Sequence, residues 1–274
     1  MEFAILLATY NSEKFISEQI DSILNQSVKK YKLYIKDDGS TDQTIKIIKS
    51  YTSKHNNIIL LDDGLSGRGP MNNFMWLLQN VEAQYYMFSD HDDIWLPNKV
   101  ELTFEQIIKL ERNNPGLPII VHTDLKVVDE NLEIISSSFW KYSKINPNLL
   151  KSFEYLSVSN GITGCTMIIN NMAKAVALPV GKHSTMHDSW ISLCVSCADG
   201  KIGYIDKPTV LYRQHFNNAI GASRVGSLEY YFFKLKTPFI ILKNNYKKFR
   251  MANEISTIGV FRFILFKLLY FFKR

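Results

Sequence analysis

The chain has 274 residues, of which 46% are hydrophobic and 21% are charged, with 13 glycines and 8 prolines. This composition excludes collagen-like, low-complexity and intrinsically disordered proteins, and the length allows one large domain or two small ones. The formal net charge of +6 is uneven: residues 228–274 hold ten Lys and Arg against two Glu, a charge of +8, which leaves −2 for residues 1–227 and no basic surface there suited to nucleic acid.

The N-terminal part of the chain alternates between strand and helix patterns. The predicted elements are, in order, a strand at 3–8, a helix at 13–26 with Ser12 as its N-cap, a strand at 31–35, a helix at 41–53 and a strand at 57–61. This order is typical of parallel βαβ units, whose right-handed crossovers bring the strand-end loops to one edge of a sheet. Because open α/β sheets bind ligands at that edge, we look for chemistry in these loops.

The strand patterns continue further along the chain. Apolar runs at 84–88, 118–121, 163–169, 201–205 and 210–213 predict more strands, and the periodicity of 97–112 predicts a helix. No repeat, linker or low-complexity segment interrupts this part. We therefore expect residues 1–223 to form one α/β domain with a mostly parallel, helix-flanked sheet, and residues 224–274 to form a helical tail.

The cysteines and the N-terminus both bear on the compartment. Three cysteines cannot form a disulfide framework, which favours a reducing compartment. Cys194 and Cys197 have the C-x-x-C spacing, but they lie in an apolar helix pattern, so we expect them to pack in the core rather than to bind zinc. The apolar N-terminal run has no basic stretch before it and no small-residue cleavage site, so no secretory signal is expected.

An acidic cluster follows the predicted strand at 84–88. Asp90, Asp92 and Asp93 stand within four residues, where they repel each other and lose hydration unless a cation or a proton compensates them. Mg²⁺ and Mn²⁺ bind such carboxylates together with substrate phosphates. A solvated acidic turn is the alternative, but the buried strand before the cluster and the Ile-Trp-Leu-Pro after it favour the metal site.

Two further polar segments end the first two predicted strands. Thr9-Tyr10-Asn11 follows the first, and Asp37-Asp38-Gly39-Ser40 follows the second. Asp38 is suited to accept a hydrogen bond from a base N–H or a ribose hydroxyl, and Gly39 permits a sharp turn. An ordinary turn with a helix N-cap is the alternative for this second segment.

These motifs, in this order, resemble the inverting family 2 glycosyltransferases with a GT-A fold, whose SDxDDxWxPxK pattern the stretch SDHDDIWLPNKV matches closely. The resemblance covers residues 3–223. It continues through the glycine segment at 161–165, the H-D-x-W element at 187–190, and the Y-R-x-H ending at 212–215 with Asn217 and Asn218. It is most typical of enzymes that build bacterial surface polysaccharides, rhamnosyltransferases among them.

The resemblance implies a role for each matching residue. Thr9, Tyr10, Asn11 and Asp38 would bind the nucleotide, with Asp38 at a uracil or thymine. Asp90 and Asp92 would orient the ribose and a divalent cation, Mn²⁺ or Mg²⁺, with Asp92 as the first choice of metal ligand, and His215 would add a ligand or touch the diphosphate. Asp188 would be the general base, and the acceptor side would include Gly164 and Trp190. Arg68 and Asn73, in a loop that matches the family loosely, would contact phosphate or sugar.

One position departs from the family pattern. The second residue of the acidic motif is commonly Gln, whereas this chain has His91, which leaves open whether that position contacts the sugar or the acceptor. The chemistry itself needs charge compensation on the leaving diphosphate, a carboxylate to take the acceptor proton, and both substrates held in line. A single base opposite the leaving group gives inversion at the anomeric carbon.

The segment 228–274 is rich in aromatic, apolar and basic residues. Its last apolar run is interrupted by Arg262 and Lys267 and falls short of the roughly 20 mostly uncharged residues that span a membrane. Phe and Leu interleaved with Lys and Arg are typical of interfacial helices. We expect peripheral attachment to the cytoplasmic face of the cell membrane; helices packed on the domain or on a partner chain are the alternative.

The predicted activity is transfer of a sugar from a UDP- or dTDP-sugar to a lipid-linked or growing saccharide. A nucleotide-sugar-binding scaffold without transferase activity is the alternative. A nucleotidyltransferase is disfavoured, because residues 9–12 hold Thr-Tyr-Asn-Ser instead of a glycine-rich basic loop. Sugar selectivity depends on side chains from several loops, so neither the donor sugar nor the acceptor follows from the sequence.

Overall fold

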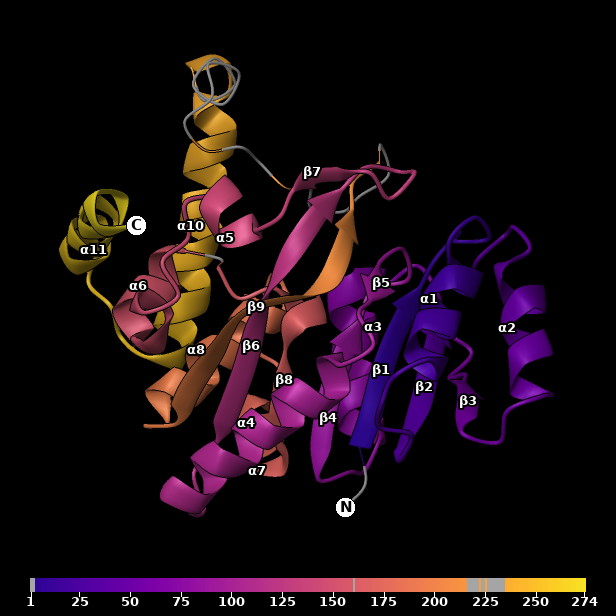
Figure 1. The fold of residues 1–274 in the computed structure, drawn as a ribbon. Helices are drawn as coiled ribbons and strands as arrows, with labels where there is room; N and C mark the ends of the chain where they lie inside the picture. Colours follow the sequence, from indigo (N-terminus) through magenta and orange to yellow (C-terminus); the bar gives the residue numbers. More distant parts are fainter. Residues whose placement is uncertain (1–2, 160, 216–221, 223–224, 226–234) are drawn as a thin grey trace.

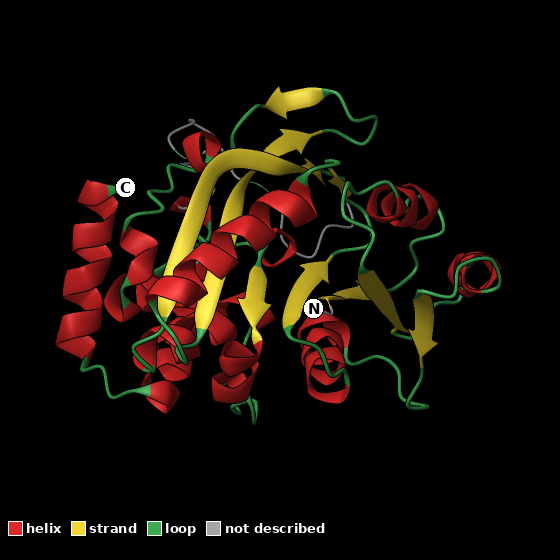
Figure 2. Ribbon diagram, turned by 60° about the horizontal axis from the view of Figure 1, so that its bottom comes forward, coloured by secondary structure: helices red, strands yellow, loops and turns green. Residues whose placement is uncertain are grey.

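The computed structural model describes residues 3–159, 161–215, 222, 225 and 235–274. In that part of the chain one sheet of nine strands is flanked by helices on both faces (Figure 1, Figure 2). The strands are β1 (Phe3–Thr9), β2 (Tyr31–Asp37), β3 (Ile58–Leu61), β4 (Tyr85–Ser89), β5 (Ile94–Trp95), β6 (Ile119–Val128), β7 (Ile134–Ser136), β8 (Ile168–Asn170) and β9 (Lys201–Arg213). The helices are α1 (Ile16–Leu24), α2 (Thr44–Thr52), α3 (Gly69–Asn80), α4 (Lys99–Asn113), α5 (Phe139–Tyr142), α6 (Phe153–Val158), α7 (Asn171–Ala177), α8 (His187–Cys197), α10 (Pro238–Ile255) and α11 (Val260–Lys273), with 3-10 turns at Leu149–Lys151 and Gly164–Thr166.

The strand order is β3-β2-β1-β4-β8-β6-β9-β5, with β7 paired to β6. The first four strands in this order run parallel, as the sequence predicts. The rest of the sheet is mixed, because β8 runs antiparallel to both β4 and β6, and β5 runs antiparallel to β9. The order in which strands are added to the sheet reverses at β1: β2 and β3 lie on one side of it, and β4 lies on the other. Open α/β sheets bind ligands at such a switch point.

Successive side chains of β1 enter two different cores. Ala4 and Leu6 pack with residues of α3, α7 and α8 on one face, whereas Ile5 and Leu7 pack with residues of α1, α2 and α4 on the other. A strand that is buried on both faces reads as a continuous apolar run. This explains why residues 3–8 show no alternation in the sequence.

Several element predictions are corrected by the structure. The run 163–169 is a 3-10 turn followed by the short β8, and the two strands predicted at 201–205 and 210–213 are one strand, β9. A register shift against β6 between Ile205 and Pro208 accommodates the polar residues that separate the two apolar runs in the sequence.

Two helix predictions are also corrected. Helix α3 is missed, although Pro70 near its first position is a helix-start signal. Ser12 is not the N-cap of α1: its hydroxyl lies 2.6 Å from that of Thr9.

The tail helices pack on the rest of the protein. Met251 and Ala252 of α10 and Phe263 of α11 are buried in the same core as α3 and α8. No single described helix is both long and apolar enough to cross a membrane; α10 and α11 meet such a criterion only as a pair, bent by 118°. The boundary predicted at 223/224, like Asn217 and Asn218, involves residues outside the described part.

The cysteines are free. Cys194 is buried in the core, as expected, but Cys197 at the end of α8 is exposed, so the prediction that both pack in the core is wrong for the second.

Candidate active site

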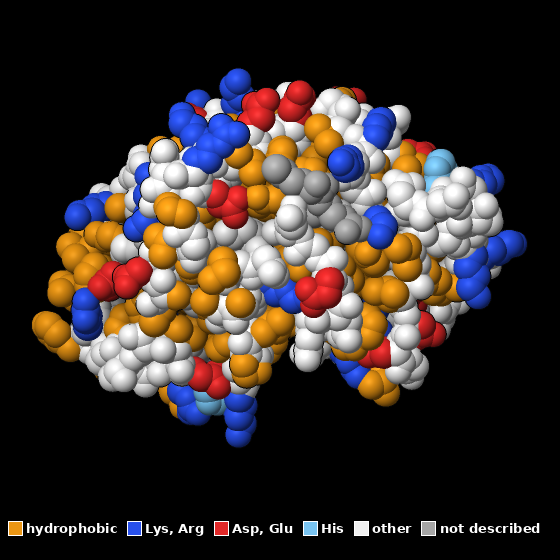
Figure 3. Space-filling model, turned by 90° about the horizontal axis from the view of Figure 1, so that it is seen from below, with side chains coloured by type: hydrophobic (Ala, Val, Ile, Leu, Met, Phe, Trp, Pro, Cys, Tyr) orange, Lys and Arg blue, Asp and Glu red, His pale blue; other side chains and the backbone are white. Residues whose placement is uncertain are grey.

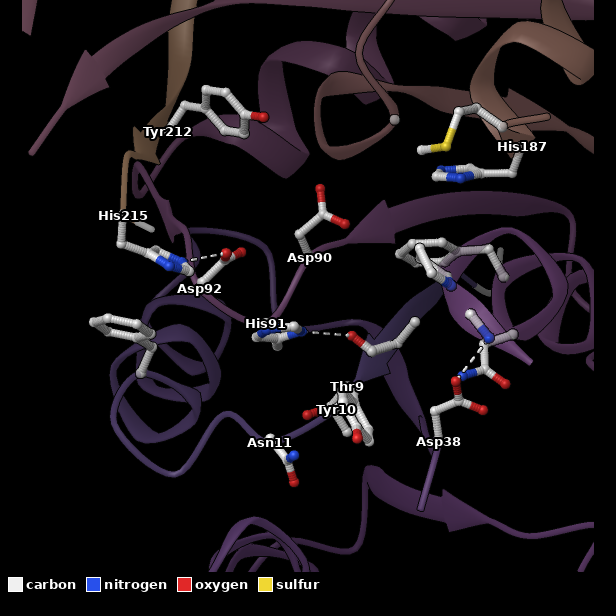
Figure 4. Close-up of a pocket in the computed structure, with 18 of the residues that line it drawn as sticks. Thr9, Tyr10, Asn11, Asp38, Asp90, His91, Asp92, His187, Tyr212 and His215 are labelled. Carbon is white, nitrogen blue, oxygen red and sulfur yellow. Dashed lines mark hydrogen bonds and ion pairs between the residues drawn. The ribbon is translucent and has the colours of Figure 1, made fainter. Parts of the chain in front are cut away.

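A cavity of about 1030 Å³ opens beside the carboxyl ends of β1, β2 and β4. Other parts of its lining come from α3, from the turn at Gly164–Thr166, from the start of α8 and from the residues that follow β9. The predicted site residues that line it are Thr9, Tyr10, Asn11, Asp38, Asn73, Asp90, Asp92, Gly164, Asp188 and His215. In Figure 4, Asp90 lies between the Asp92–His215 pair on one side and His187 on the other.

The turn after β2 is built by Asp37 rather than by Asp38. The Asp37 carboxylate accepts hydrogen bonds from the backbone N–H groups of Gly39 at 2.9 Å and Ser40 at 2.7 Å. Gly39 has a φ of +88°, and a Cβ there would lie 2.6 Å from the Cβ of Ser66, so both its conformation and its surroundings require glycine. Asp37 therefore stabilises the turn, and Asp38 lines the cavity.

Asp38 also ties β2 to α3. Its two carboxylate oxygens accept hydrogen bonds from the backbone N–H groups of Arg68 at 3.0 Å and Gly69 at 2.8 Å. Each oxygen keeps the capacity for another hydrogen bond, because a carboxylate oxygen has two lone pairs. Asp38 is therefore held rigidly at the cavity wall, and its carboxylate is still able to accept a hydrogen bond from a ligand.

The acidic loop after β4 is held by residues at the end of β9. The Nε2 of His215 lies 2.8 Å from Oδ2 of Asp92. Arg213 donates from Nε to the Asp92 carbonyl at 2.9 Å and pairs with Glu18 of α1 at 2.5 Å. The loop is thus fixed at Asp92 by the end of β9, and Arg213 is itself anchored to α1.

The charge of Asp90 is poorly compensated within the protein. Burial, together with the negative charges of Asp92 and Asp188, raises the pKa of Asp90 to about 7. A divalent cation bound there would relieve this repulsion. Two carboxylates and the imidazole of His215 are also donors that suit Mn²⁺ or Mg²⁺, so the residues fit the ion that the sequence predicts.

Asp90 also belongs to a second set of potential metal ligands. Asp90, Asp93 and Cys165 form a set of potential ligands whose atoms all lie within 4.8 Å of one another. Burial is the largest factor that raises the pKa of Cys165 well above its ordinary value, so it stays a thiol, which is a poor ligand for a hard cation. The sequence places Asp93 in the acidic cluster without giving it a role of its own, and it gives no indication of Cys165. The thiol makes this set a poor fit to Mn²⁺ or Mg²⁺.

Asp188 lies in the first turn of α8. Its Oδ1 accepts hydrogen bonds from the backbone N–H of Ser189 at 2.6 Å and from the Ser189 hydroxyl at 3.2 Å, and its Oδ2 accepts from the N–H of Gly164 at 3.2 Å. Burial raises the pKa of Asp188 to about 6, whereas these hydrogen bonds and the charge of Lys248 oppose the shift. The carboxylate is therefore ionised at neutral pH and more basic than an exposed aspartate.

Two buried polar side chains face the cavity without a partner in the described structure. The Oδ1 of Asn73 and both ring nitrogens of His187 accept or donate no hydrogen bond there. Burial lowers the pKa of His187 to about 3, so its imidazole is neutral. A Cβ on Gly164 would lie 2.2 Å from Nε2 of His187, which explains the glycine. In the sequence, His187 is the first residue of the H-D-x-W element, which by itself indicates no role for its imidazole.

Two predicted residues do not line the cavity. The indole of Trp190 is buried in the core, where it donates to the carbonyl of Ala177 at 2.8 Å. The guanidinium of Arg68 pairs with Asp63 at 3.1 Å. Their positions fit structural roles, Trp190 in the packing of α8 and Arg68, through its backbone N–H, in holding Asp38.

Comparison with known sequences identifies relatives of this chain. The model of the family described as glycosyl transferase family 2 matches residues 4–176. A protein of Shigella flexneri named dTDP-rhamnosyl transferase is 29% identical over 235 residues, which cover 79% of this chain and 74% of that protein. An uncharacterized glycosyltransferase of Rickettsia typhi is 28% identical over 172 residues, and this chain spans about half of its length, 49%.

Solved structures share the fold. TarS of Staphylococcus aureus in complex with UDP-GlcNAc matches with a TM-score of 0.58 at 19% identity, covering 93% of this chain and 71% of that one. A mannosyltransferase of Pyrobaculum calidifontis in complex with GDP-Man and Mn²⁺ matches with a TM-score of 0.58 at 13% identity, covering 98% and 73%. At these identities the likeness concerns the fold alone, and it confirms the predicted α/β architecture of GT-A glycosyltransferases.

Proposed function

Because the chain belongs to glycosyl transferase family 2, we propose that it transfers a sugar, with inversion, from a UDP- or dTDP-linked donor to a hydroxyl of a lipid-linked or growing saccharide. The observation that carries this proposal is that Asp90 and Asp188, from segments far apart in the sequence, line one cavity. We propose that the acceptor is an intermediate of bacterial surface polysaccharide synthesis. The names of two similar proteins, a dTDP-rhamnosyl transferase and a poly(ribitol-phosphate) glycosyltransferase, support this class of acceptor.

The acidity of the cavity supports metal dependence. Its charged lining is Glu13, Asp38, Asp42, Asp90, Asp92, Glu130 and Asp188 against Lys14, which itself pairs with Glu130. Such a surface would repel a nucleoside diphosphate unless a cation came with it. Asp90, Asp92 and His215 would hold Mn²⁺ or Mg²⁺, and the bound ion would supply charge stabilisation for the leaving diphosphate.

The transfer step is a single displacement in which Asp188 is the base. Its carboxylate takes the proton of the acceptor hydroxyl as the acceptor oxygen bonds to the anomeric carbon. The bond from that carbon to the diphosphate oxygen breaks, and its electron pair leaves with the diphosphate. A pKa of about 6 suits this role, because the base is ionised near neutrality yet binds a proton more readily than an ordinary aspartate.

Two groups of lining residues suit the two parts of the donor. Tyr10, which is 52% exposed, and Asp38 both line the cavity, and between them they would stack on a nucleobase and accept its hydrogen bond. Asn73 and His187 lie buried on the α3 and α8 side, where hydroxyl groups of the transferred sugar would satisfy their unpartnered atoms. This arrangement assigns sugar contacts to neutral side chains.

The exposed side of the tail supports attachment to a membrane surface. Phe239 and Leu242 of α10 and Phe261, Leu268 and Phe272 of α11 are exposed, and residues 228–274 carry ten Lys and Arg against two Glu. Hydrophobic side chains gather at the left edge of Figure 3, on the side where Figure 1 places α11. We therefore place the enzyme at the cytoplasmic face of the cell membrane, beside a lipid-linked acceptor.

The proposal is tested by sugar transfer from a panel of UDP- and dTDP-sugars with Mn²⁺ or with EDTA. Nucleoside diphosphate release that needs the metal and is lost in Asp92→Ala and Asp188→Asn is the expected result. Full activity in both variants would refute the assigned roles. Tight donor binding without turnover on any acceptor would instead identify a nucleotide-sugar-binding scaffold.

A further inference from the structure

One face of α10 packs on the helix that carries Asp188. Lys248, Met251, Ala252 and Ile255 recur at the spacing of a single helical face. Met251 and Ala252 are buried in the core that also contains Trp190 of α8. This face joins the tail to the catalytic half of the protein, independently of the exposed aromatic side chains on its other faces.

Glu254 of α10 holds the turn that leads into α8. Its Oε1 accepts a hydrogen bond from the backbone N–H of Lys182 and its Oε2 from that of His183, both at 2.8 Å. The turn is closed by the N–H of Ser184, which donates to the carbonyl of Gly181 at 3.2 Å. Both carboxylate oxygens are therefore committed to one short stretch of backbone.

Other contacts from α10 fall on the same stretch. An Nη2 of Arg250 lies 2.7 Å from Nε2 of His183, and the Thr185 hydroxyl lies 3.6 Å from the sulfur of Met251. Met186, the next residue, lines the cavity. The positive charge of Lys248 also lowers the pKa of Asp188. Residues 182–185 are thus fastened to α10 immediately before the base.

The packing leaves this turn little freedom of its own. A Cβ on Gly181 would lie 2.3 Å from the Trp190 ring and 2.8 Å from the Glu254 carboxyl carbon. The turn, the first turn of α8 and α10 are therefore in direct contact, so a displaced turn would move the start of α8.

We propose that α10 belongs to the catalytic apparatus and that Glu254 is a positioning residue, which fixes the turn at 181–184 so that Asp188 meets the acceptor hydroxyl. This inference rests on the proposed role of Asp188 as the base. A small displacement of a catalytic group lowers the rate of the chemical step strongly, because that rate depends on alignment with the reacting atoms. Donor binding should change little, because its nucleotide part is assigned to Tyr10 and Asp38 at the ends of β1 and β2, outside the start of α8.

The experiment measures nucleoside diphosphate release from a UDP- or dTDP-sugar with Mn²⁺, water being the acceptor, together with donor-binding stoichiometry by calorimetry. Glu254→Ala should lower kcat about 10- to 100-fold, while the donor KM changes far less and the binding stoichiometry stays unchanged. Glu254→Gln keeps one acceptor oxygen and should be intermediate. Arg262→Ala is the matched control, because it breaks the 2.6 Å ion pair from α11 to Glu154 without touching the turn, and its kcat should stay near that of the wild type.

Three results would overturn the positioning role. These are an unchanged kcat in Glu254→Ala, an equal loss in Arg262→Ala, and a binding stoichiometry that falls in proportion to kcat, which would mean loss of folded protein. Full turnover in Asp188→Asn would instead refute the proposed base. An inactive Asp188→Asn beside a fully active Glu254→Ala would refute the role of Glu254 alone.

Discussion

Oδ2 of Asp92 lies 2.8 Å from Nε2 of His215, a contact that joins the loop after β4 to the residues after β9. Beside this pair, burial and two neighbouring carboxylates raise the pKa of Asp90 to about 7. The charged form of Asp90 is thus disfavoured in the folded protein without metal, and a cation must compete with a proton for this carboxylate.

Mn²⁺ should therefore stabilise the protein more at pH 8 than at pH 5.5. At the higher pH the carboxylates are ionised and repel one another until the ion binds, whereas at the lower pH protons already occupy Asp90. Thermal unfolding with Mn²⁺ or EDTA at the two pH values measures the effect. Asp92→Asn should reduce the shift, and Asp206→Asn, which removes an exposed carboxylate outside the cavity, should not. Equal shifts at both pH values would contradict the role of Asp90.

Asp188→Asn should lower the rate of transfer strongly and stabilise the fold at pH 8. Removing a general base typically costs about 10²- to 10⁴-fold in rate. The folded pKa of about 6 lies above the ordinary 3.8, so the wild type loses stability as pH rises from about 4 to about 6, and the amide does not. The roughly two-unit shift corresponds to at most about 3 kcal/mol.

Urea unfolding of both proteins at pH 4 and pH 8 measures this difference. The stability gained by the asparagine variant should be present at pH 8 and should shrink at pH 4, where the aspartic acid is largely protonated in the folded protein. A variant that is less stable than the wild type at pH 8 would show that the hydrogen bonds to Gly164 and Ser189 outweigh the cost of the buried charge.

Lys248→Met should move the acidic limb of the pH–rate profile upward. The ammonium of Lys248 favours the ionised form of Asp188 and so lowers its pKa. The carboxylates of Asp188 and Asp90 repel each other, which raises the pKa of Asp90. Without the lysine, Asp188 should bind its proton at a higher pH than the wild-type value near 6. The measurement is kcat/KM at saturating Mn²⁺ between pH 5 and pH 9. Lys247→Met, at the exposed neighbouring position, should leave the limb in place.

Asn73→Ala should weaken binding of the nucleotide sugar but not of the free nucleoside diphosphate. One lost hydrogen bond to a sugar hydroxyl is worth about 1 kcal/mol, or roughly five-fold in Kd. Calorimetric titration with the nucleotide sugar and with the diphosphate alone separates the two contributions. Asn72→Ala is the control, because Asn72 is exposed and its amide bonds only the Arg68 carbonyl among the contacts described. Equal weakening for both ligands would place Asn73 at the nucleotide instead.

Phe261→Glu and Phe272→Glu should reduce flotation with anionic vesicles without changing the unfolding temperature. The two rings are 80% and 79% exposed, so each adds apolar surface to the proposed membrane face and little to the core. Ile134→Glu is the control, since Ile134 is 61% exposed on β7, outside the tail. Unchanged flotation in both phenylalanine variants would mean that the tail packs on the domain or on a partner chain and does not bind the membrane.

The motifs at the strand ends could be read directly from the sequence. The apolar runs before Thr9, Asp37 and Asp90 predict buried parallel strands, and right-handed crossovers then bring their carboxyl ends to one edge, so these residues had to lie near each other. The acidic loop, Asp188 and His215 belong to a spacing that matches one family, which is why most of the predicted residues line the cavity. Local pattern and chain topology were sufficient for the strand-end residues, whereas Asp188 and His215 followed from the resemblance to the family.

Packing between distant segments was not readable in that way. Asp37 and Asp38 are adjacent acids, yet only the approach of α3 gives Asp38 its partners, the backbone N–H groups of Arg68 and Gly69. Trp190 has the same motif context as Asp188, but the helical rotation between them turns its ring into the core. In the sequence, Glu254 is one of two acids in a basic tail, and nothing there indicates a role for it. The structure shows that its carboxylate binds the turn before α8. Each of these outcomes depends on which surfaces meet, because a side chain's role follows from its spatial neighbours, and those are set by contacts that no local pattern encodes.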